Sequence, residues 1–205
     1  MAFGPFGFIF RRCGAFFARG KFDDALYKEV FRSYVGYLVR EGVTQEFFIE
    51  GGRSRTGKTL NPRFGMLSWD VEAFLGSSRR DLFFVPVGLT YERLVEEELI
   101  VDEQRGGEKR KESVLRLVRA RKFLQRRFGT AHVNFGEPIS LADALGDRRP
   151  VLASSGPGKD EKRHFVEGLA HRIVEQINGA TAANSTAVAA SVLLGNRETG
   201  MRHEV

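Results

Sequence analysis

The residues best suited to chemistry lie in a short glycine-rich, basic run that follows an apolar stretch. The run occupies residues 50–58 and reads EGGRSRTGK, and no acidic residue lies between positions 51 and 63. Glycines let backbone N–H groups approach a ligand, and an arginine fork can grip two phosphate oxygens at once. The run therefore predicts a phosphate-binding loop. Its candidate ligands are Arg53, Ser54, Arg55 and Lys58.

The same run also satisfies the G-x-x-x-x-G-K-[ST] pattern of nucleotide hydrolases, over residues 52–59. In that fold a helix begins at the lysine, but here Pro62 follows closely, and the residue before a proline is pushed out of the α region. Glu46 and Glu50 also do not suit a buried parallel strand ahead of the loop. We therefore predict that no helix starts at Lys58. A nucleotide-binding module or a non-catalytic phosphate-binding domain is the alternative function.

The net charge of +6 is unevenly distributed along the chain. Residues 1–22 carry four bases and no acid, and residues 51–63 do the same. Two acid-free basic segments favour a phosphate-bearing partner, which on charge alone can be nucleic acid, anionic lipid or a phosphorylated small molecule. Residues 105–127 hold ten bases against two acids, and a solvated helix face explains that segment equally well.

Apolar spacing around the loop predicts alternating helices and strands. Helices are expected over residues 25–41 (ended by Gly42), 66–75, 111–128 and 165–177. Strands are expected over residues 45–49, 82–87 and 131–135, and Pro86 should mark an edge or a strand end. Residues 180–194 should be helical with little to bury. This order predicts an α/β fold. The single cysteine, Cys13, excludes a disulfide framework and is expected to be a buried small hydrophobe.

Four segments share their wording and order with one enzyme family. They are residues 14–19 (GAFFAR), 48–57 (FIEGGRSRTG), 85–87 (VPV, with Tyr91-Glu92) and 133–138 (VNFGEP). The first three resemble the second, third and fourth motifs of the glycerol-3-phosphate 1-O-acyltransferase family, and the last continues the match. The resemblance covers most of residues 3–178. The third motif separates this branch from the lysophosphatidate acyltransferases, but the related dihydroxyacetone-phosphate acyltransferases are harder to distinguish.

The resemblance implies a mostly parallel sheet flanked by helices, incomplete at the N-terminus. It divides the chain into a partial acyltransferase domain, residues 1–178, and an Ala/Ser/Thr-rich helical segment, residues 179–205. It assigns acceptor-phosphate contacts to Arg19 and Arg53, with Arg55 and Lys58 as further candidates. Glu50 and Gly51 would shape the acceptor pocket, and a loop-anchoring role for Glu50 stays equally open. Pro86 matches a proline associated with the acyl-donor side.

The implied reaction moves a fatty acyl group from acyl-CoA or acyl carrier protein to the 1-hydroxyl of glycerol 3-phosphate, in phospholipid synthesis. The resemblance implies no cofactor, metal or nucleic acid. It implies peripheral association with an anionic membrane at its cytoplasmic face, and no stretch reaches the roughly 18 uninterrupted apolar residues of a spanning helix. The acyl-chain preference, the choice of donor and the oligomeric state do not follow from the sequence.

The family's first motif, His-x4-Asp, supplies the catalytic base, and this chain does not contain it. His132 stands five residues before Glu137, but both lie in a part that matches a non-catalytic segment of the family. His164 and His171 should lie on a solvated helix face. We therefore name no catalytic residue and expect the chain to be a fragment of a longer enzyme. A naturally truncated product, or a degenerate domain that binds without catalysis, would also lack the motif.

Overall fold

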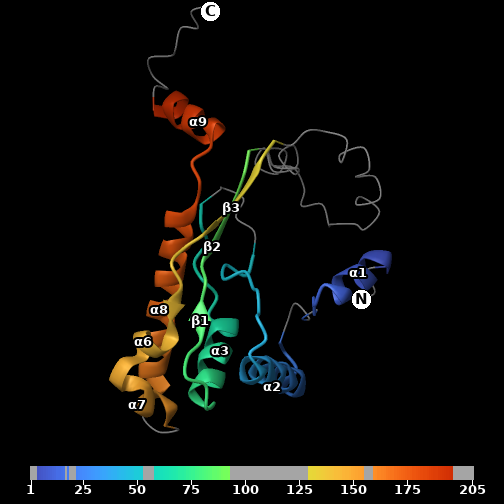
Figure 1. Cartoon of the computed structure of the whole chain (residues 1–205), viewed down its shortest axis with the longest axis vertical. Helices are drawn as coiled ribbons and strands as arrows, with labels where there is room; N and C mark the ends of the chain where they lie inside the picture. The colour runs from blue at the N-terminus through green and yellow to red at the C-terminus, as the bar shows by residue number, and fades with distance from the viewer. Residues whose placement is uncertain are drawn as a thin grey trace, which may run out of the picture.

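The computed structural model describes residues 4–16, 18, 22–52, 58–92, 129–154 and 159–195. The described residues form both helices and strands, as the predicted α/β fold requires. Figure 1 shows the long helix α8 running beside the strands. The elements, in chain order, are α1 (Gly4–Arg12), α2 (Ala25–Glu41), α3 (Gly65–Leu75), β1 (Phe83–Phe84), β2 (Val87–Tyr91), β3 (Ala131–Phe135), β4 (Ile139–Ser140), α6 (Leu141–Leu145), the 3-10 turn η2 (Gly146–Arg148), α7 (Arg149–Ala153), α8 (Lys159–Ala180) and α9 (Ser185–Gly195).

Helix α2 has the bounds that its sequence predicts, because both ends carry capping residues. The Asp24 carboxylate accepts hydrogen bonds from the backbone N–H groups of Leu26, at 2.9 Å, and Tyr27, at 3.2 Å. Gly42 ends the helix in the left-handed conformation, with φ of 74°. The predicted helix over residues 66–75 is also confirmed, as α3. The apolar residues that α2 buries are Phe31, Val35, Leu38 and Val39.

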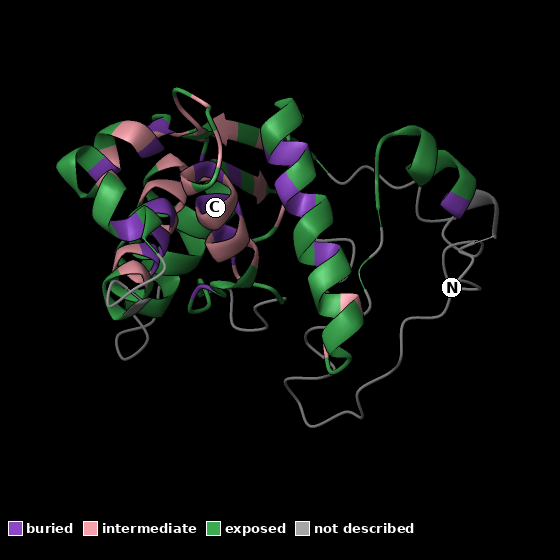
Figure 2. Ribbon diagram, turned by 90° about the horizontal axis from the view of Figure 1, so that it is seen from below, coloured by how far each residue is buried: buried purple, intermediate pink, exposed green. Residues whose placement is uncertain are grey.

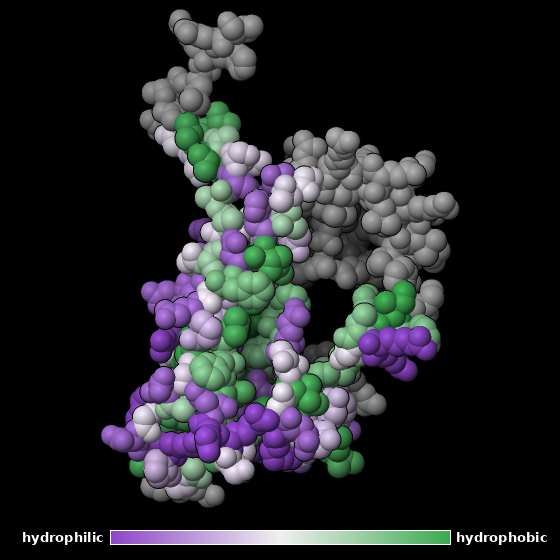
Figure 3. All heavy atoms as spheres, in the orientation of Figure 1, coloured by the Kyte–Doolittle hydropathy of each residue, from purple (hydrophilic) through white to green (hydrophobic). Residues whose placement is uncertain are grey.

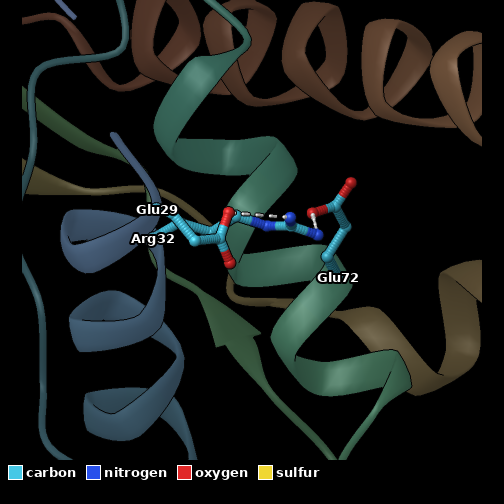
Figure 4. Close-up of polar contacts among 3 residues, drawn as sticks. All are labelled: Glu29, Arg32 and Glu72. Atoms are coloured by element: carbon cyan, nitrogen blue, oxygen red, sulfur yellow. Dashed lines mark hydrogen bonds and ion pairs between the residues drawn. The ribbon is translucent and has the colours of Figure 1, made fainter. Parts of the chain in front are cut away.

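Helices α2 and α3 are held together by an ion pair and by ring packing. The Arg32 guanidinium lies 2.8 Å from the Glu72 carboxylate and 3.4 Å from Glu29, as Figure 4 shows. The rings of Phe31 and Trp69 pack with their centroids 5.7 Å apart. The ring packing contributes more than the ion pair, since both partners of that pair are partly exposed to solvent.

The described strands form two antiparallel pairs. Strand β1 pairs with β4, and β2 pairs with β3 in a register from Val87 opposite Phe135 to Tyr91 opposite Ala131. The predicted strand over residues 82–87 is divided into two at Pro86, which has no N–H to give to a ladder. These residues therefore show a mixed helix and strand fold but not the mostly parallel sheet that we predicted.

The predicted strand over residues 45–49 is wrong. Residues 43–48 have no regular secondary structure, and residues 49–50 form a turn. The apolar spacing did predict burial correctly, because Ile49 is buried in the core and Phe47 packs against the core. A strand also needs a hydrogen-bonded neighbour, and no described strand pairs with this segment.

The core lies where α3, α6, α7 and α8 meet the β1–β4 pair, and Figure 2 shows the buried residues gathered there and along α2. Asp81 joins the layers: its carboxylate accepts hydrogen bonds from the backbone N–H groups of Leu82, at 2.7 Å, and Ala142, at 2.9 Å, and from the Ser140 hydroxyl, at 2.7 Å. The fully buried aliphatic and aromatic residues include Leu67, Val71, Phe74, Ile139, Leu141, Leu145 and Leu152.

The remaining predictions about elements have mixed outcomes. Strand β3 and the helix over residues 165–177, now α8, are confirmed, and α9 is helical without one buried residue. The boundary proposed after residue 178 falls in the last turn of α8. Cys13 is exposed just after α1, so its predicted burial is wrong: a turn beyond a short helix has few neighbours to cover it. The predicted helix over residues 111–128 lies outside the described residues.

Candidate functional site

The predicted phosphate-binding loop has a fixed base. Across it, the Arg63 backbone N–H donates to the Ile49 carbonyl, at 2.7 Å, and the Leu60 backbone N–H donates to the Glu50 carboxylate, at 2.8 Å. Gly51 turns the chain out of the base with φ of 60°, a left-handed conformation that favours glycine. The two ends of the loop are therefore held side by side.

Glu50 takes the anchoring role in this arrangement. Its carboxylate closes the loop through Leu60, which satisfies a backbone donor that would otherwise need water. Of the two roles that the sequence left open for Glu50, loop anchoring is the one that a contact in the structure supports. Contact between Glu50 and an acceptor stays a prediction.

The loop is also tied to the C-terminal end of α8. The Thr59 hydroxyl donates to the Asn178 side-chain oxygen at 2.6 Å, across 119 positions of sequence. Strand β2 reaches the same end of α8, because a Cβ added to Gly88 would lie 3.2 Å from the Ile177 carbonyl oxygen. The last turns of α8 therefore adjoin both the predicted acceptor loop and the strand that follows Pro86. Asn178 carried no sequence signal, since a lone asparagine near a helix end is common.

Pro86 is fully buried between β1 and β2. Its carbonyl accepts a hydrogen bond from the Gly136 backbone N–H at 2.8 Å, and a Cβ added to Gly136 would lie 3.2 Å from the Pro86 Cβ. In the described part of the chain, Pro86 therefore positions the β2–β3 pair and offers no open surface of its own.

The other predicted site residues divide into two groups. Gly51 lies at one end of the loop, and Lys58 is exposed at the other. Nothing in the structure tests whether they bind an acceptor. Four predicted ligands lie outside the described residues. They are Arg19, Arg53, Ser54 and Arg55.

The nucleotide-hydrolase interpretation fails at the position where we expected it to fail. Residues 59–64 are not helical, and the next helix, α3, begins only at Gly65. A phosphate-binding loop of that class needs a helix N-terminus directly after the lysine. The prediction that no helix starts at Lys58 is confirmed, and the nucleotide-binding alternative has no support.

None of the described histidines forms a catalytic pair. His132 lies on β3 opposite Thr90, and no ion pair or hydrogen bond among the described residues joins it to Glu137. On α8, His171 is exposed and the His164 side chain is 73% exposed, which confirms the solvated face. Within the described ranges, no group of three His, Cys, Asp or Glu side chains lies close enough to hold a metal ion.

Two carboxylates among the described residues have shifted pKa values. Asp70, on α3, is only 3% exposed, and burial raises its pKa to about 7. Its Oδ1 atom has no hydrogen-bond partner in the part of the chain that the structure describes. Burial also acts to raise the pKa of Asp81, but the hydrogen bonds from Ser140 and the backbone outweigh it and hold that pKa below its usual value. Sequence reasoning missed Asp70, and its apolar neighbours Trp69 and Val71 were the signal that could have indicated burial.

Comparison with known proteins places the whole chain among acyltransferases. The model of the glycerol-3-phosphate acyltransferase C-terminal region matches residues 101–205, and the acyltransferase model matches residues 1–90. The chain is 37% identical to a glycerol-3-phosphate acyltransferase of Pasteurella multocida, over 98% of this chain and 25% of the relative. It is 41% identical to one of Pseudomonas fluorescens, over 92% of this chain and 23% of the relative. The chain thus spans about a quarter of the length of these relatives.

Proposed function

We propose a function for this chain from the premise that it belongs to the glycerol-3-phosphate acyltransferase family. The chain forms the acceptor-binding part of an enzyme that moves a fatty acyl group from a thioester to the 1-hydroxyl of glycerol 3-phosphate. The donor is acyl-CoA or acyl carrier protein. Dihydroxyacetone phosphate is the closest competing acceptor, because it presents the same phosphate group.

The observation that carries this proposal is the hydrogen-bonded base of the predicted loop over residues 50–63. Its base is fixed by the Ile49–Arg63 and Glu50–Leu60 hydrogen bonds, and it holds no acid between its two ends. Several bases with no acid among them suit a phosphate, because charge-assisted hydrogen bonds to an anion are strong. In the proposed site Arg53 and Arg19 contact the acceptor phosphate, and Ser54, Arg55 and Lys58 add donors around it.

The chemical step needs a base that takes the proton from the acceptor hydroxyl as its oxygen attacks the thioester carbon. The thiol leaves with a proton, and the acyl group stays on the acceptor oxygen. This chain has no His-x4-Asp motif, so we propose that another segment of the full enzyme supplies the base. Glu50 and Gly51 position the acceptor, and Pro86 sets the geometry of the strands on the donor side.

Two broader features belong to the same proposal. The complete domain contains a mostly parallel sheet flanked by helices. The described antiparallel strands extend that sheet. The enzyme works peripherally at the cytoplasmic face of an anionic membrane, where basic side chains that do not contact the acceptor meet lipid head groups. No described helix is long and apolar enough to cross a bilayer. Flotation with anionic and with neutral vesicles tests the membrane part, since binding should require the anionic lipid.

Substitution of Arg53 tests the acceptor site. A hybrid enzyme is made by replacing the matched quarter of the Pasteurella multocida relative with this chain. In the hybrid, Arg53→Ala should raise KM for glycerol 3-phosphate by about ten- to a hundredfold, because a charge-assisted bond to phosphate is lost. KM for the acyl donor and Tm should hardly change. Arg53→Lys should recover only part of the loss, because an ammonium group cannot make the two-pronged contact.

Arg163→Ala is the matched control, because Arg163 is an exposed arginine on α8. It removes the same charge and should leave both KM values unchanged. If Arg53→Ala instead unfolds the hybrid, or impairs donor and acceptor equally, the loop is structural and the assigned phosphate site is wrong. A ligand-displacement assay on the isolated chain tests the nucleotide-binding alternative. If ATP displaces the bound ligand and glycerol 3-phosphate does not, that alternative is supported.

A further inference from the structure

Arg63 has a fixed backbone at the base of the predicted phosphate-binding loop, and its side chain has no assigned role. Its backbone N–H donates to the Ile49 carbonyl at 2.7 Å. The preceding residue, Pro62, is buried, and a proline ring fixes its own φ. The Arg63 side chain therefore starts from a defined position, beside the segment from which the chain enters the loop.

The stem of the Arg63 side chain packs against Gly51, on the other side of the loop base. A Cβ added to Gly51 would lie 2.7 Å from the Arg63 Cγ, 3.3 Å from its Cβ and 3.9 Å from its Cδ. Real Cβ atoms essentially never approach another heavy atom within 3.0 Å, so a side chain at position 51 would displace Arg63. Gly51 thus meets two requirements: it adopts φ of 60°, and it leaves room for the arginine stem.

The charge of Arg63 has no acidic partner within the described residues. Arg63 is exposed, and it forms no ion pair or side-chain hydrogen bond in that part of the chain. The Glu50 carboxylate, at the same loop base, is hydrogen-bonded to the Leu60 N–H instead. A guanidinium keeps its charge at every physiological pH and carries five N–H donors. As far as the described residues are concerned, these donors are available to an anion.

Two structural roles do not account for a base at this position. Helix α3 begins at Gly65, and a cation beside a helix N-terminus opposes the helix dipole instead of stabilising the helix. The segment that leads into α3 lies above this helix in Figure 1, whereas Figure 3 shows hydrophilic residues gathered mainly along the lower edge of the same view. Neither helix stabilisation nor a shared solvated face therefore explains Arg63.

We propose that Arg63 is a further ligand of the acceptor phosphate and that Gly51 keeps its side chain in position. Two N–H groups of the guanidinium donate to two oxygens of a phosphate monoester. The inference rests on the proposed function, because it adds a residue to the same acceptor site. It also gives Gly51 a physical part in shaping that site, since a side chain at position 51 would move Arg63 away.

Substitution of Arg63 in the hybrid enzyme tests the phosphate contact. Arg63→Gln removes the charge but keeps the backbone N–H and most of the stem, so the hybrid should fold with an unchanged Tm. KM for glycerol 3-phosphate should rise by about tenfold or more, because a charge-assisted hydrogen bond to phosphate is lost. KM for the acyl donor should stay the same, and Arg63→Lys should recover part of the loss.

Arg163→Gln, at the exposed control position on α8, removes the same charge and should change neither KM. An unaltered KM for glycerol 3-phosphate in Arg63→Gln would overturn the proposal. A lowered Tm with both KM values raised would do the same, because it would make the side chain structural.

A double-mutant cycle tests whether Gly51 positions Arg63. Gly51→Ala should also raise KM for glycerol 3-phosphate, because the added methyl group displaces the arginine. In that background Arg63→Gln should add less than about twofold, since changes that act through one contact are not additive. Gly52→Ala is the control: its added Cβ would lie 3.9 Å from the nearest atom, so Arg63→Gln should keep its full effect there. A full effect in both backgrounds would overturn the positioning by Gly51.

Chemical modification of arginine gives a readout that does not depend on turnover. Phenylglyoxal reacts with exposed guanidinium groups, and peptide mass spectrometry gives the rate at each arginine, in the 205-residue chain and in the hybrid. Glycerol 3-phosphate at ten times its Kd should slow modification of Arg63 about tenfold, by mass action. Arg163 should keep its rate, and glycerol, which lacks the phosphate, should protect neither residue. A cooperative thermal transition shows that each sample is folded.

The pattern of protection separates this inference from the proposed function. Protection of Arg53 without protection of Arg63 would support the acceptor site and overturn the role of Arg63. Protection of both in a folded hybrid that transfers no acyl group would refute the proposed reaction and keep Arg63 as a phosphate ligand. Protection of Arg63 by ATP and not by glycerol 3-phosphate, or protection of neither arginine in any folded sample, would overturn the inference.

Discussion

Replacing Asp70 by asparagine should change how stability depends on pH. Burial raises the pKa of this carboxyl from 3.8 to about 7, and no charged partner offsets the effect. Because the folded pKa is the higher one, the folded state holds its proton more tightly than the unfolded state. The stability that Asp70 contributes is therefore fully present below about pH 4 and is lost as the pH rises through about 7. The full loss corresponds to about 4 kcal/mol.

Between about pH 4.5 and pH 8.5 this carboxyl should lower the free energy of unfolding by about 3 kcal/mol. The amide of Asp70→Asn is neutral throughout, so the stability of the variant relative to the parent should rise by that amount across the range. Urea unfolding of both proteins at a series of pH values measures the difference in their free energies of unfolding. Other titrating groups contribute equally to both proteins, so they cancel in this difference. Asp23→Asn, at an exposed position, controls for loss of one negative charge and should change stability by less than about 0.5 kcal/mol. A difference for Asp70→Asn that is independent of pH would refute the reasoning.

Three smaller predictions concern the elements around the loop. Asp81→Ala should cost about 2–3 kcal/mol in urea unfolding at neutral pH, because Ser140 and two backbone groups lose a charged acceptor; since the pKa of Asp81 is lowered, the charge-dependent part of that cost should be fully present above about pH 4 and be lost as the pH falls further, through the lowered pKa. An unchanged midpoint would contradict it. Gly51→Ala should cost about 1–2 kcal/mol through left-handed strain, whereas Gly52→Ala, which has no positive φ, should cost clearly less. Equal costs would remove the argument from φ. Thr59→Val should lower Tm by about 2–4 °C by breaking the Asn178 contact, and Asn178→Ala should add little to it.

Local signals in the sequence were sufficient for α2, α3, α8 and α9, whereas the short helices α1, α6 and α7 were not predicted. Asp24 and Gly42 mark the ends of α2, and an apolar stripe lies between them, so the helix is specified by residues within it. Strand β3 was equally readable, since it is a short apolar and aromatic run closed by Gly136. The predicted phosphate-binding loop was located from composition, and the structure adds two hydrogen bonds at its base.

Features that depend on distant residues could not be predicted in this way. The segment before Gly51 has the apolar content of a strand, but whether it pairs is decided by other strands. Pro86 marked a strand end, yet only the structure shows two strands meeting there with partners β4 and β3. The contact between Thr59 and Asn178 joins residues 119 positions apart, and nothing local to either predicts it.

The most direct test of the central claim is acyl transfer by the hybrid enzyme. Purified hybrid is given a labelled acyl thioester and glycerol 3-phosphate, and the formation of 1-acyl-glycerol 3-phosphate is followed. We predict turnover by the hybrid and none above background by the 205-residue chain alone, since a missing general base costs about a hundred- to ten-thousandfold. Arg53→Ala in the hybrid should weaken glycerol 3-phosphate use and spare the donor. Robust turnover by the isolated chain, or a folded hybrid that transfers no acyl group, would contradict the account.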